Sequence, residues 1–223
     1  DLTPNSATSS GGYAFSPRVW NGIIEYSSLG GGTPTTGQVT TTFAGGNGQY
    51  GNYFQVYVSL SGGINVTSMT GNFKAAGNVE VWTRSGAIGS SPGSSGWTQV
   101  ATATVPTSGQ QSFSTNFNLS AGSHTILFSN STYLDYTNGS SVGAVAGQDA
   151  NLTIYEGYGT PDLTPTSGNG YKYSPRVWNG IIQYSPLGGS STSGQVTTTF
   201  NNDNVSYGNY FEVNVTAPGG INV

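Results

Sequence analysis

His124 is the only histidine in this sequence, so a Ser-His-Asp triad would depend on it. The run Gly89-Ser90-Ser91-Pro92-Gly93 has the Gly-x-Ser-x-Gly spacing of a nucleophile elbow, which holds a reactive serine between a strand and a helix. Here Pro92 follows the serine inside a Gly- and Ser-rich loop, and no helical pattern comes after it. We therefore interpret the spacing as chance, and we predict that His124 is a surface residue at the start of a strand.

The acidic residues offer little acid-base chemistry, because the whole chain has only nine of them. Glycosidases need two carboxyl groups on either side of the bond that they cleave. Glu25 and Glu80 could form such a pair, but Gln183 replaces Glu25 in a second copy of the same motif. Roles in ion pairs or in contact with solvent are therefore favoured. The sequence predicts no catalytic residue, and we do not expect an enzyme.

Calcium is the one cofactor that the sequence suggests. Asp135, Asn138, Asp149 and Asn151 lie in or beside a predicted loop over residues 133–148. Carboxylate, amide and backbone carbonyl oxygens are the ligands that calcium prefers, which makes Asp135 and Asp149 the candidate ligands. The spacing of an EF-hand loop is absent. The alternative is that these side chains form local Asx turns.

Sugars are a second candidate ligand, because four aromatic residues could form a flat platform for sugar rings. These residues are Tyr50, Tyr53, Tyr57 and Trp82. The alternative is that the same rings cover a sheet and only stabilise it. Separately, seven Asn-x-Ser/Thr sequons are candidate glycosylation sites: Asn65, Asn118, Asn130, Asn138, Asn151, Asn204 and Asn214.

The composition excludes several classes of protein. Only 6% of the residues are charged, against about a quarter in a typical domain. A net charge of -4 with five basic residues argues against nucleic acid, which requires a basic face. The absence of cysteine excludes disulfides and thiolate metal sites. No apolar run approaches the roughly 18 residues of a membrane-spanning helix, so no membrane span is expected.

The elements that position these residues are organised by an internal repeat. The segment Ser16–Ile24 returns without change as Ser174–Ile182. Four further segments return in the same order: Asp1–Pro4 as Asp162–Pro165, Gly37–Phe43 as Gly194–Phe200, Tyr50–Phe54 as Tyr207–Phe211, and Gly62–Val66 as Gly219–Val223. We therefore predict a complete unit over residues 1–161 and the first part of a homologous unit over residues 162–223. The identical surroundings of Trp20 and Trp178 predict that these two residues pack in equivalent sites.

Alternating apolar residues predict that both units are built from β-strands. Residues 53–60 give the clearest pattern, with Phe54, Val56, Val58 and Leu60 on one face. The second copy repeats this face as Phe211, Val213, Val215 and Ala217. Further strands are expected over residues 19–26, 38–43, 78–84, 97–105, 113–119, 124–128 and 151–155. Short strands separated by Gly, Ser and Asn turns indicate an all-β fold, an antiparallel, jelly-roll-like β-sandwich.

Residues 162–223 hold only the first strands of such a sandwich, which cannot bury an apolar face alone. We expect a partner to cover this face: the rest of a longer chain, another subunit, or residues 1–161.

Four motifs resemble the tandem β-sandwich repeats of large secreted bacterial surface adhesins and extracellular filament proteins. They are Phe15–Gly22, Val79–Arg84, Ala121–Ile126 and Asn151–Gly157. The resemblance implies surface display, adhesion or fibre formation, and it supplies no catalytic residue. We therefore expect a non-catalytic structural or adhesive protein, extracellular or at the cell surface, whose partners are copies of itself or further repeats of the same chain. The alternative is a carbohydrate-binding module of a secreted protein, with surface glycans as its partners.

Overall fold

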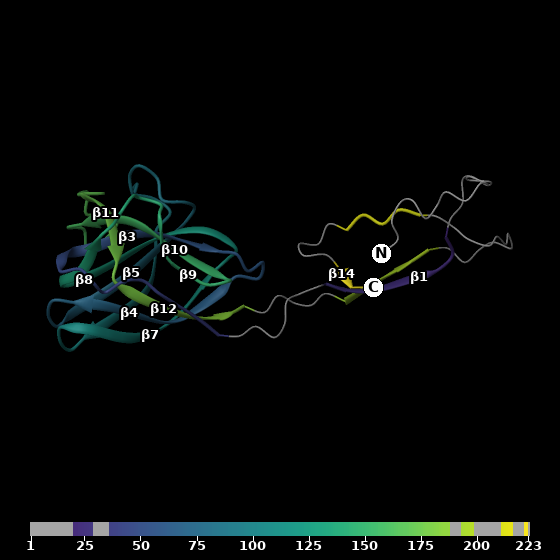
Figure 1. Ribbon diagram of the computed structural model, residues 1–223, viewed down its shortest axis with the longest axis horizontal. Coiled ribbons are helices and arrows are strands. Elements are labelled where there is room, and N and C mark those ends of the chain that lie inside the picture. Colours follow the sequence, from purple (N-terminus) through teal and green to yellow (C-terminus); the bar gives the residue numbers. More distant parts are fainter. Residues whose placement is uncertain (1–19, 29–35, 188–192, 199–210, 216–220, 223) are drawn as a thin grey trace. The chain divides into compact units, whose positions relative to one another are not determined.

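The computed structural model describes residues 20–28, 36–187, 193–198, 211–215 and 221–222, shown in colour in Figure 1. Among these residues all regular structure is β-strand, and every strand pairing is antiparallel. The predicted all-β, antiparallel sandwich is therefore confirmed. The described part of the chain contains no helix that could cross a membrane. The chain divides into two compact units, which we call the main unit (Gly31–Ser190) and the small unit (Asp1–Gly30 with Ser191–Val223).

The main unit contains eleven strands in one hydrogen-bonded network. They are β2 (Gly37–Thr40), β3 (Asn47–Val58), β4 (Ile64–Phe73), β5 (Gly77–Ser85), β6 (Thr98–Val105), β7 (Gly109–Leu119), β8 (Gly122–Asn138), β9 (Val145–Gln148), β10 (Leu152–Thr160), β11 (Tyr173–Trp178) and β12 (Gly180–Pro186). The central order is β11-β10-β3-β8-β4-β12-β2, while β5 joins β8, β6 joins β5, β7 joins β4 and β9 joins β10.

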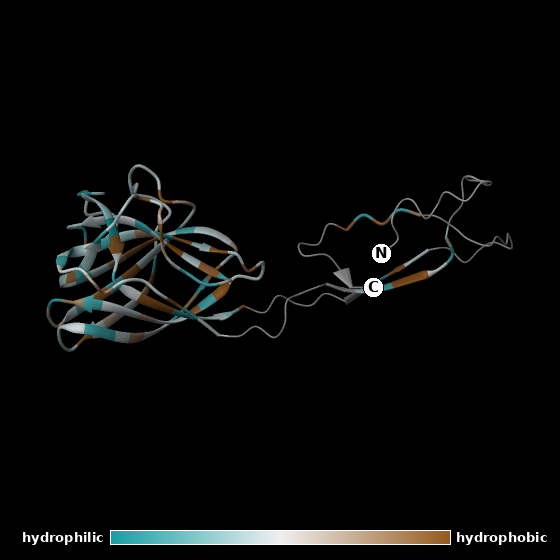
Figure 2. Ribbon diagram, in the orientation of Figure 1, coloured by the Kyte–Doolittle hydropathy of each residue, from teal (hydrophilic) through white to brown (hydrophobic). Residues whose placement is uncertain are grey.

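One apolar core holds the main unit together. The alternation predicted for residues 53–60 is present in β3, where Phe54, Val56 and Val58 are buried and Tyr57 is exposed. Figure 2 shows apolar and polar residues alternating along the strands of this unit. Removing these side chains from water is the main stabilising contribution, at roughly 25 cal/mol for each Å² of apolar surface.

Two predictions about the elements were wrong. The predicted loop over residues 133–148 is largely strand, because β8 continues to Asn138 and β9 begins at Val145. Strand β4 was not predicted, because its Ser, Thr, Asn and Gly residues hide the apolar period, although Ile64, Val66 and Met69 are fully buried.

The compact units do not follow the division of the sequence at residue 161. Strands β11 and β12 belong to the second sequence copy, yet they complete a sandwich whose other strands come from the first copy. The small unit is the counterpart: β1 (Ile23–Ser28), from the first copy, pairs with β13 (Ser193–Thr197) and β14 (Ile221–Asn222), from the second. Each unit therefore combines residues of both copies.

Candidate functional site: the closing strand

Strand β12 closes the main unit, because it is hydrogen-bonded along both edges. Ile182 lies opposite Val39 of β2 on one side and opposite Met69 of β4 on the other. Both Ile182 and Tyr184 point into the core and are buried. Strand β12 is thus an internal strand of the first-copy sandwich, supplied by the second copy.

Trp178 precedes this strand and anchors it in the core. Its indole stacks on the Phe54 ring, with the ring centroids 4.7 Å apart and the planes 8° apart. Phe128 contacts it from a second direction, with centroids 5.2 Å apart. The indole also lies directly over Gly180, where a Cβ atom would be 2.2 Å from the indole Cζ2. The Trp-Asn-Gly sequence therefore needs glycine at its third position for the tryptophan to fold onto the chain.

Thr41, the residue after β2, holds this turn in place. Its hydroxyl donates to the carbonyl of Trp178 and accepts a hydrogen bond from the backbone N–H of Gly180 at 3.0 Å. The backbone N–H of Thr41 donates to the carbonyl of Gly180, also at 3.0 Å. These bonds satisfy backbone groups that would otherwise be costly to bury. They fix the second-copy strand to the first-copy sandwich at a defined register.

The small unit repeats this arrangement with the roles of the two copies exchanged. Ile24 lies opposite Val196, and the Trp20 and Phe211 rings stack with centroids 4.8 Å apart. The hydroxyl of Thr198 donates to the carbonyl of Trp20 and accepts from the N–H of Gly22 at 2.9 Å. These contacts of Trp20 match those of Trp178, as their identical surroundings predict, but the described residues of the small unit provide no ring contact like that of Phe128 with Trp178.

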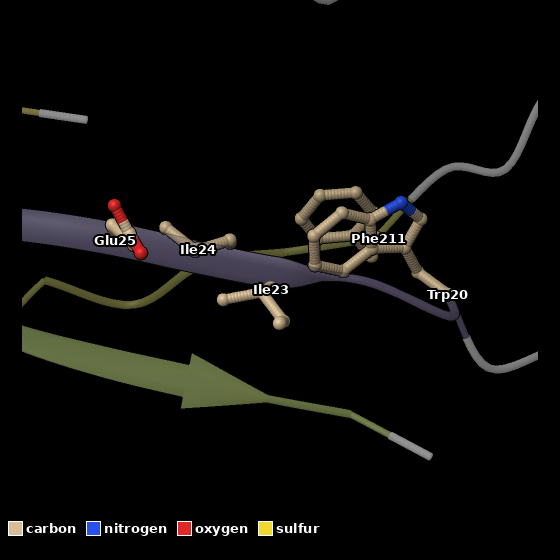
Figure 3. A pocket seen from close by; sticks show the side chains of 5 residues that line it. All are labelled: Trp20, Ile23, Ile24, Glu25 and Phe211. Carbon is tan, nitrogen blue, oxygen red and sulfur yellow. The ribbon is translucent and has the colours of Figure 1, made fainter. Parts of the chain in front are cut away.

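Burial is what distinguishes the two units. Four apolar side chains of the main unit are almost fully buried, with exposed fractions of 0% for Phe54, 0% for Val56, 1% for Val58 and 2% for Val39. The matching residues of the small unit are about half exposed, with fractions of 51% for Phe211, 51% for Val213, 43% for Val215 and 54% for Val196. An open hollow of about 620 Å³ lies against this face of the small unit, lined by Trp20, Ile23, Ile24, Glu25 and Phe211 (Figure 3). Within the described residues, the small unit thus presents the apolar face that the main unit packs inside its core.

Three of the candidate hydrolase residues lie in the main unit: Glu80, Ser91 and His124. Ser91 is exposed in the loop between β5 and β6, as predicted. His124 is at a strand start, but the prediction that it is a surface residue was wrong: it is 6% exposed, and its Nε2 lies 2.9 Å from the carbonyl oxygen of Ser120. Glu80 accepts a hydrogen bond from the indole N–H of Trp82 at 2.9 Å.

The two calcium candidates are engaged by other groups. Asp135 forms an ion pair with Lys74, with 2.6 Å between Oδ1 and Nζ. Asp149 accepts from the backbone N–H groups of Asn151 and Leu152, both at 2.8 Å, which is the Asx-turn geometry considered as the alternative. Its other oxygen accepts from the Tyr184 hydroxyl at 2.7 Å. In the part of the chain that the structure describes, no three His, Asp or Glu side chains gather as a metal site would require.

The four platform aromatics do not form one exposed surface. Tyr53 is fully buried, and its hydroxyl donates to the carboxylate of Asp162 at 3.3 Å. Burial and this neighbouring carboxylate raise the pKa of Tyr53 well above its ordinary value. Tyr57 is exposed, whereas Tyr50 is half-buried with its ring 4.4 Å from that of Tyr133. Trp82 is also half-buried.

Asp162 is a structural residue that the sequence reasoning missed. It is fully buried and organises the segment after β10, accepting from the backbone N–H groups of Asn169 at 3.0 Å and Gly170 at 2.9 Å. Tyr171, a few residues on, packs edge-on against Tyr53 with the centroids 5.1 Å apart. The signal for Asp162 was the repeated Asp-Leu-Thr-Pro motif. A carboxylate that returns in a chain with so few of them has a fixed set of partners.

The sequons differ in accessibility. Asn130 is fully buried, and its side-chain oxygen accepts from the backbone N–H of Thr132 at 2.7 Å, so the folded chain cannot present it to a glycosyltransferase. The remaining sequons fall into three groups: Asn118, Asn138 and Asn214 are exposed, Asn65 and Asn151 are half-buried, and Asn204 lies outside the described residues.

No protein-family model matches this chain, and no curated protein matches its sequence. Among solved structures, it is similar to the cysteine protease and lectin-like domains of Cwp84, a surface-layer-associated protein of Clostridium difficile, with a TM-score of 0.45 and 13% sequence identity. The similarity covers 67% of this chain and 36% of that one, so this chain spans little more than a third of that structure. The resemblance to adhesin and filament repeats therefore stays a prediction.

Proposed function

We propose that this protein is a non-catalytic structural or adhesive component of the cell surface or of an extracellular fibre, built from tandem β-sandwich units. The observation that carries the proposal is the closing strand. Because β12 comes from the second sequence copy and lies between β2 and β4 of the first, neighbouring copies share a core. Tandem units joined in this way cannot separate without opening a buried sheet.

The surface chemistry agrees with this role. Only 6% of the residues are charged, so the surface is solvated mainly by hydroxyl and amide groups, whose hydration depends little on salt. The buried carboxylate of Asp162 and the Asp149 Asx turn organise loops and sheet edges. The titratable groups described above thus serve the fold.

Carbohydrate binding is the second candidate, and one observation favours it. Tyr133 is exposed, and its ring meets that of Tyr50 edge-on at 4.4 Å, which leaves aromatic surface available to a sugar ring. This pair differs from the four-residue platform predicted from the sequence, because Tyr53 is buried beneath the segment that Asp162 organises.

The two candidates are separated by labelling and by glycan binding. Antibodies raised against the purified full chain should label surface fibres on the cells that produce it, seen by electron microscopy. A glycan panel probed with the same protein should show no binding above that of Tyr133→Ala. Glycan binding that is lost in Tyr133→Ala, with no labelling of the cell surface, would favour the carbohydrate-binding module and reject the structural role.

A further inference from the structure

The chain contains two opening strands, β1 and β12, whose inward-facing residues are the same. Ile24 corresponds to Ile182 and Tyr26 to Tyr184, and each strand follows the same Trp-Asn-Gly turn. Between Ser16 and Tyr26 and the matching residues of the second copy, the only difference is Glu25 for Gln183, and both of these residues are exposed. The two strands therefore present the same packing surface to any acceptor.

The acceptors are also equivalent. In the main unit Gln183 lies opposite Gln38 and Ile182 opposite Val39. In the small unit Glu25 lies opposite Gln195 and Ile24 opposite Val196, which is the same register on the second copy of the acceptor sequence. Either opening strand therefore fits either of these acceptor strands, with the same partner at every position along this edge.

The two acceptor positions differ in how much they bury. In the main unit, β12 pairs with β2 along one edge and with seven residues of β4 along the other. Among the described residues of the small unit, β1 has β13 on one edge and Asn222 and Ile221 of β14 on the other. The main-unit position is consequently the more stabilising one, and each chain carries two strands that fit it.

Exchange between molecules keeps nearly all of these contacts. When β1 of one molecule takes the β12 position in another, the displaced β12 can pair with β13 of its own chain, only residues 187–192 further on. Every main-unit position is then still filled, and an open chain of molecules lacks one of the less stabilising pairings, because β13 of its first molecule and β1 of its last have no partner. Because each open chain loses only this one weaker pairing, the balance between closed and exchanged forms is set largely by concentration and by the entropy of the connecting segments, which is the condition for domain swapping.

We propose that β1 of one molecule completes the main unit of a second copy of this chain, in the position that β12 occupies in the structure. The proposal rests on the structural role above and names its partner. Because the donor strand and the acceptor edge are different parts of the chain, the contact is heterologous and each added molecule leaves a new donor free. The product is an open, head-to-tail chain of molecules.

Cysteine pairs test this in the full chain, which has no cysteine of its own. In Glu25→Cys/Gln38→Cys the two thiols are opposite each other only when β1 pairs with β2. Directly opposed residues of antiparallel strands come close to the separation that a disulfide needs. After mild oxidation at high protein concentration we expect a ladder of covalent oligomers. The ladder should be shorter when the protein is diluted before it is oxidised. Adding Trp20→Ala should abolish the ladder, because it removes the indole that anchors the donor strand. Trp20 belongs to the small unit, so this change leaves the residues of the main unit intact.

Two further pairs serve as controls. Gln38→Cys/Gln183→Cys should give only an intramolecular disulfide, since these residues are opposed within the main unit. Ile23→Cys/Gln38→Cys places the first thiol two residues out of register and should not give the ladder. Equal ladders from the 23/38 and 25/38 pairs, a 25/38 disulfide found only within single molecules, or no 25/38 disulfide at all would overturn the exchange. If Gln38→Cys/Gln183→Cys formed no disulfide, the shared core on which the proposed function rests would instead be rejected.

Discussion

Replacing Trp178 by alanine should destabilise the main unit far more than the same change at Trp20. Trp178 is 1% exposed, stacks on Phe54 and packs at a tilt against Phe128, so its loss removes a large buried surface and leaves a cavity. Truncations of this kind cost about 3–5 kcal/mol. With a urea slope of about 2 kcal/mol/M, a loss of about 4 kcal/mol lowers the unfolding midpoint by about 2 M. The same change at Trp20 should cost less, because that indole is only half-buried.

The pair of variants is a matched comparison, since both tryptophans lie in the same nine-residue sequence. Urea unfolding followed by circular dichroism should show a midpoint close to that of the parent chain for Trp20→Ala and a much lower one for Trp178→Ala. Equal shifts in the two variants would mean that β12 is no better packed than β1. In that case the assignment of the closing strand to the second copy is wrong.

Three other outcomes are expected. Gly180→Ala should lower the free energy of unfolding by about 1–3 kcal/mol in urea melts, because the new Cβ overlaps the indole, while Gly46→Ala, where a Cβ meets nothing within 4 Å, should be nearly neutral. Burial and a carboxylate partner raise the pKa of Tyr184 from 10.0 to about 12, so the unfolded chain loses this proton first and stability should fall as the pH rises from about 10 to about 12. Urea midpoints across this range should fall less steeply in Tyr184→Phe. Panels of polysaccharides and esters should show no turnover, and activity that disappears in Glu80→Gln or Ser91→Ala would contradict the non-catalytic role.

The sequence predicts the strands better than it predicts which strands meet. The alternation of Phe54, Val56 and Val58 reports a buried face directly, because side chains in a strand point to opposite sides with a period of two. The partner of Ile182 could not be predicted in the same way. Since Gly37–Phe43 and Gly194–Phe200 are identical, pairing within a copy and pairing between copies look the same in sequence.

The predicted surface positions of Tyr53 and His124 were wrong for a related reason. Periodicity places Tyr53 on the outer face of β3, and in sequence that face looks like a surface. The segment that covers it, held by Asp162 and ending at Tyr171, lies more than a hundred residues further along the chain. His124 is buried at a strand start where its ring reaches the carbonyl of Ser120, a local contact that composition cannot reveal.

The origin of β12 in the second copy also sets an order of events for a chain made or exported from its N-terminus. Strands β2 to β10 emerge before β12, which lies between β2 and β4 in the folded chain. The closure seen in the structure, with β12 between β2 and β4, can form only after Pro186 has emerged, about 25 residues beyond Thr160, where β10 ends. Until its successor begins to appear, a copy can therefore close only with β1 or with an opening strand from another molecule. In an array of such copies, the units would fold in order from the N-terminus, because each new opening strand completes the core of the unit before it.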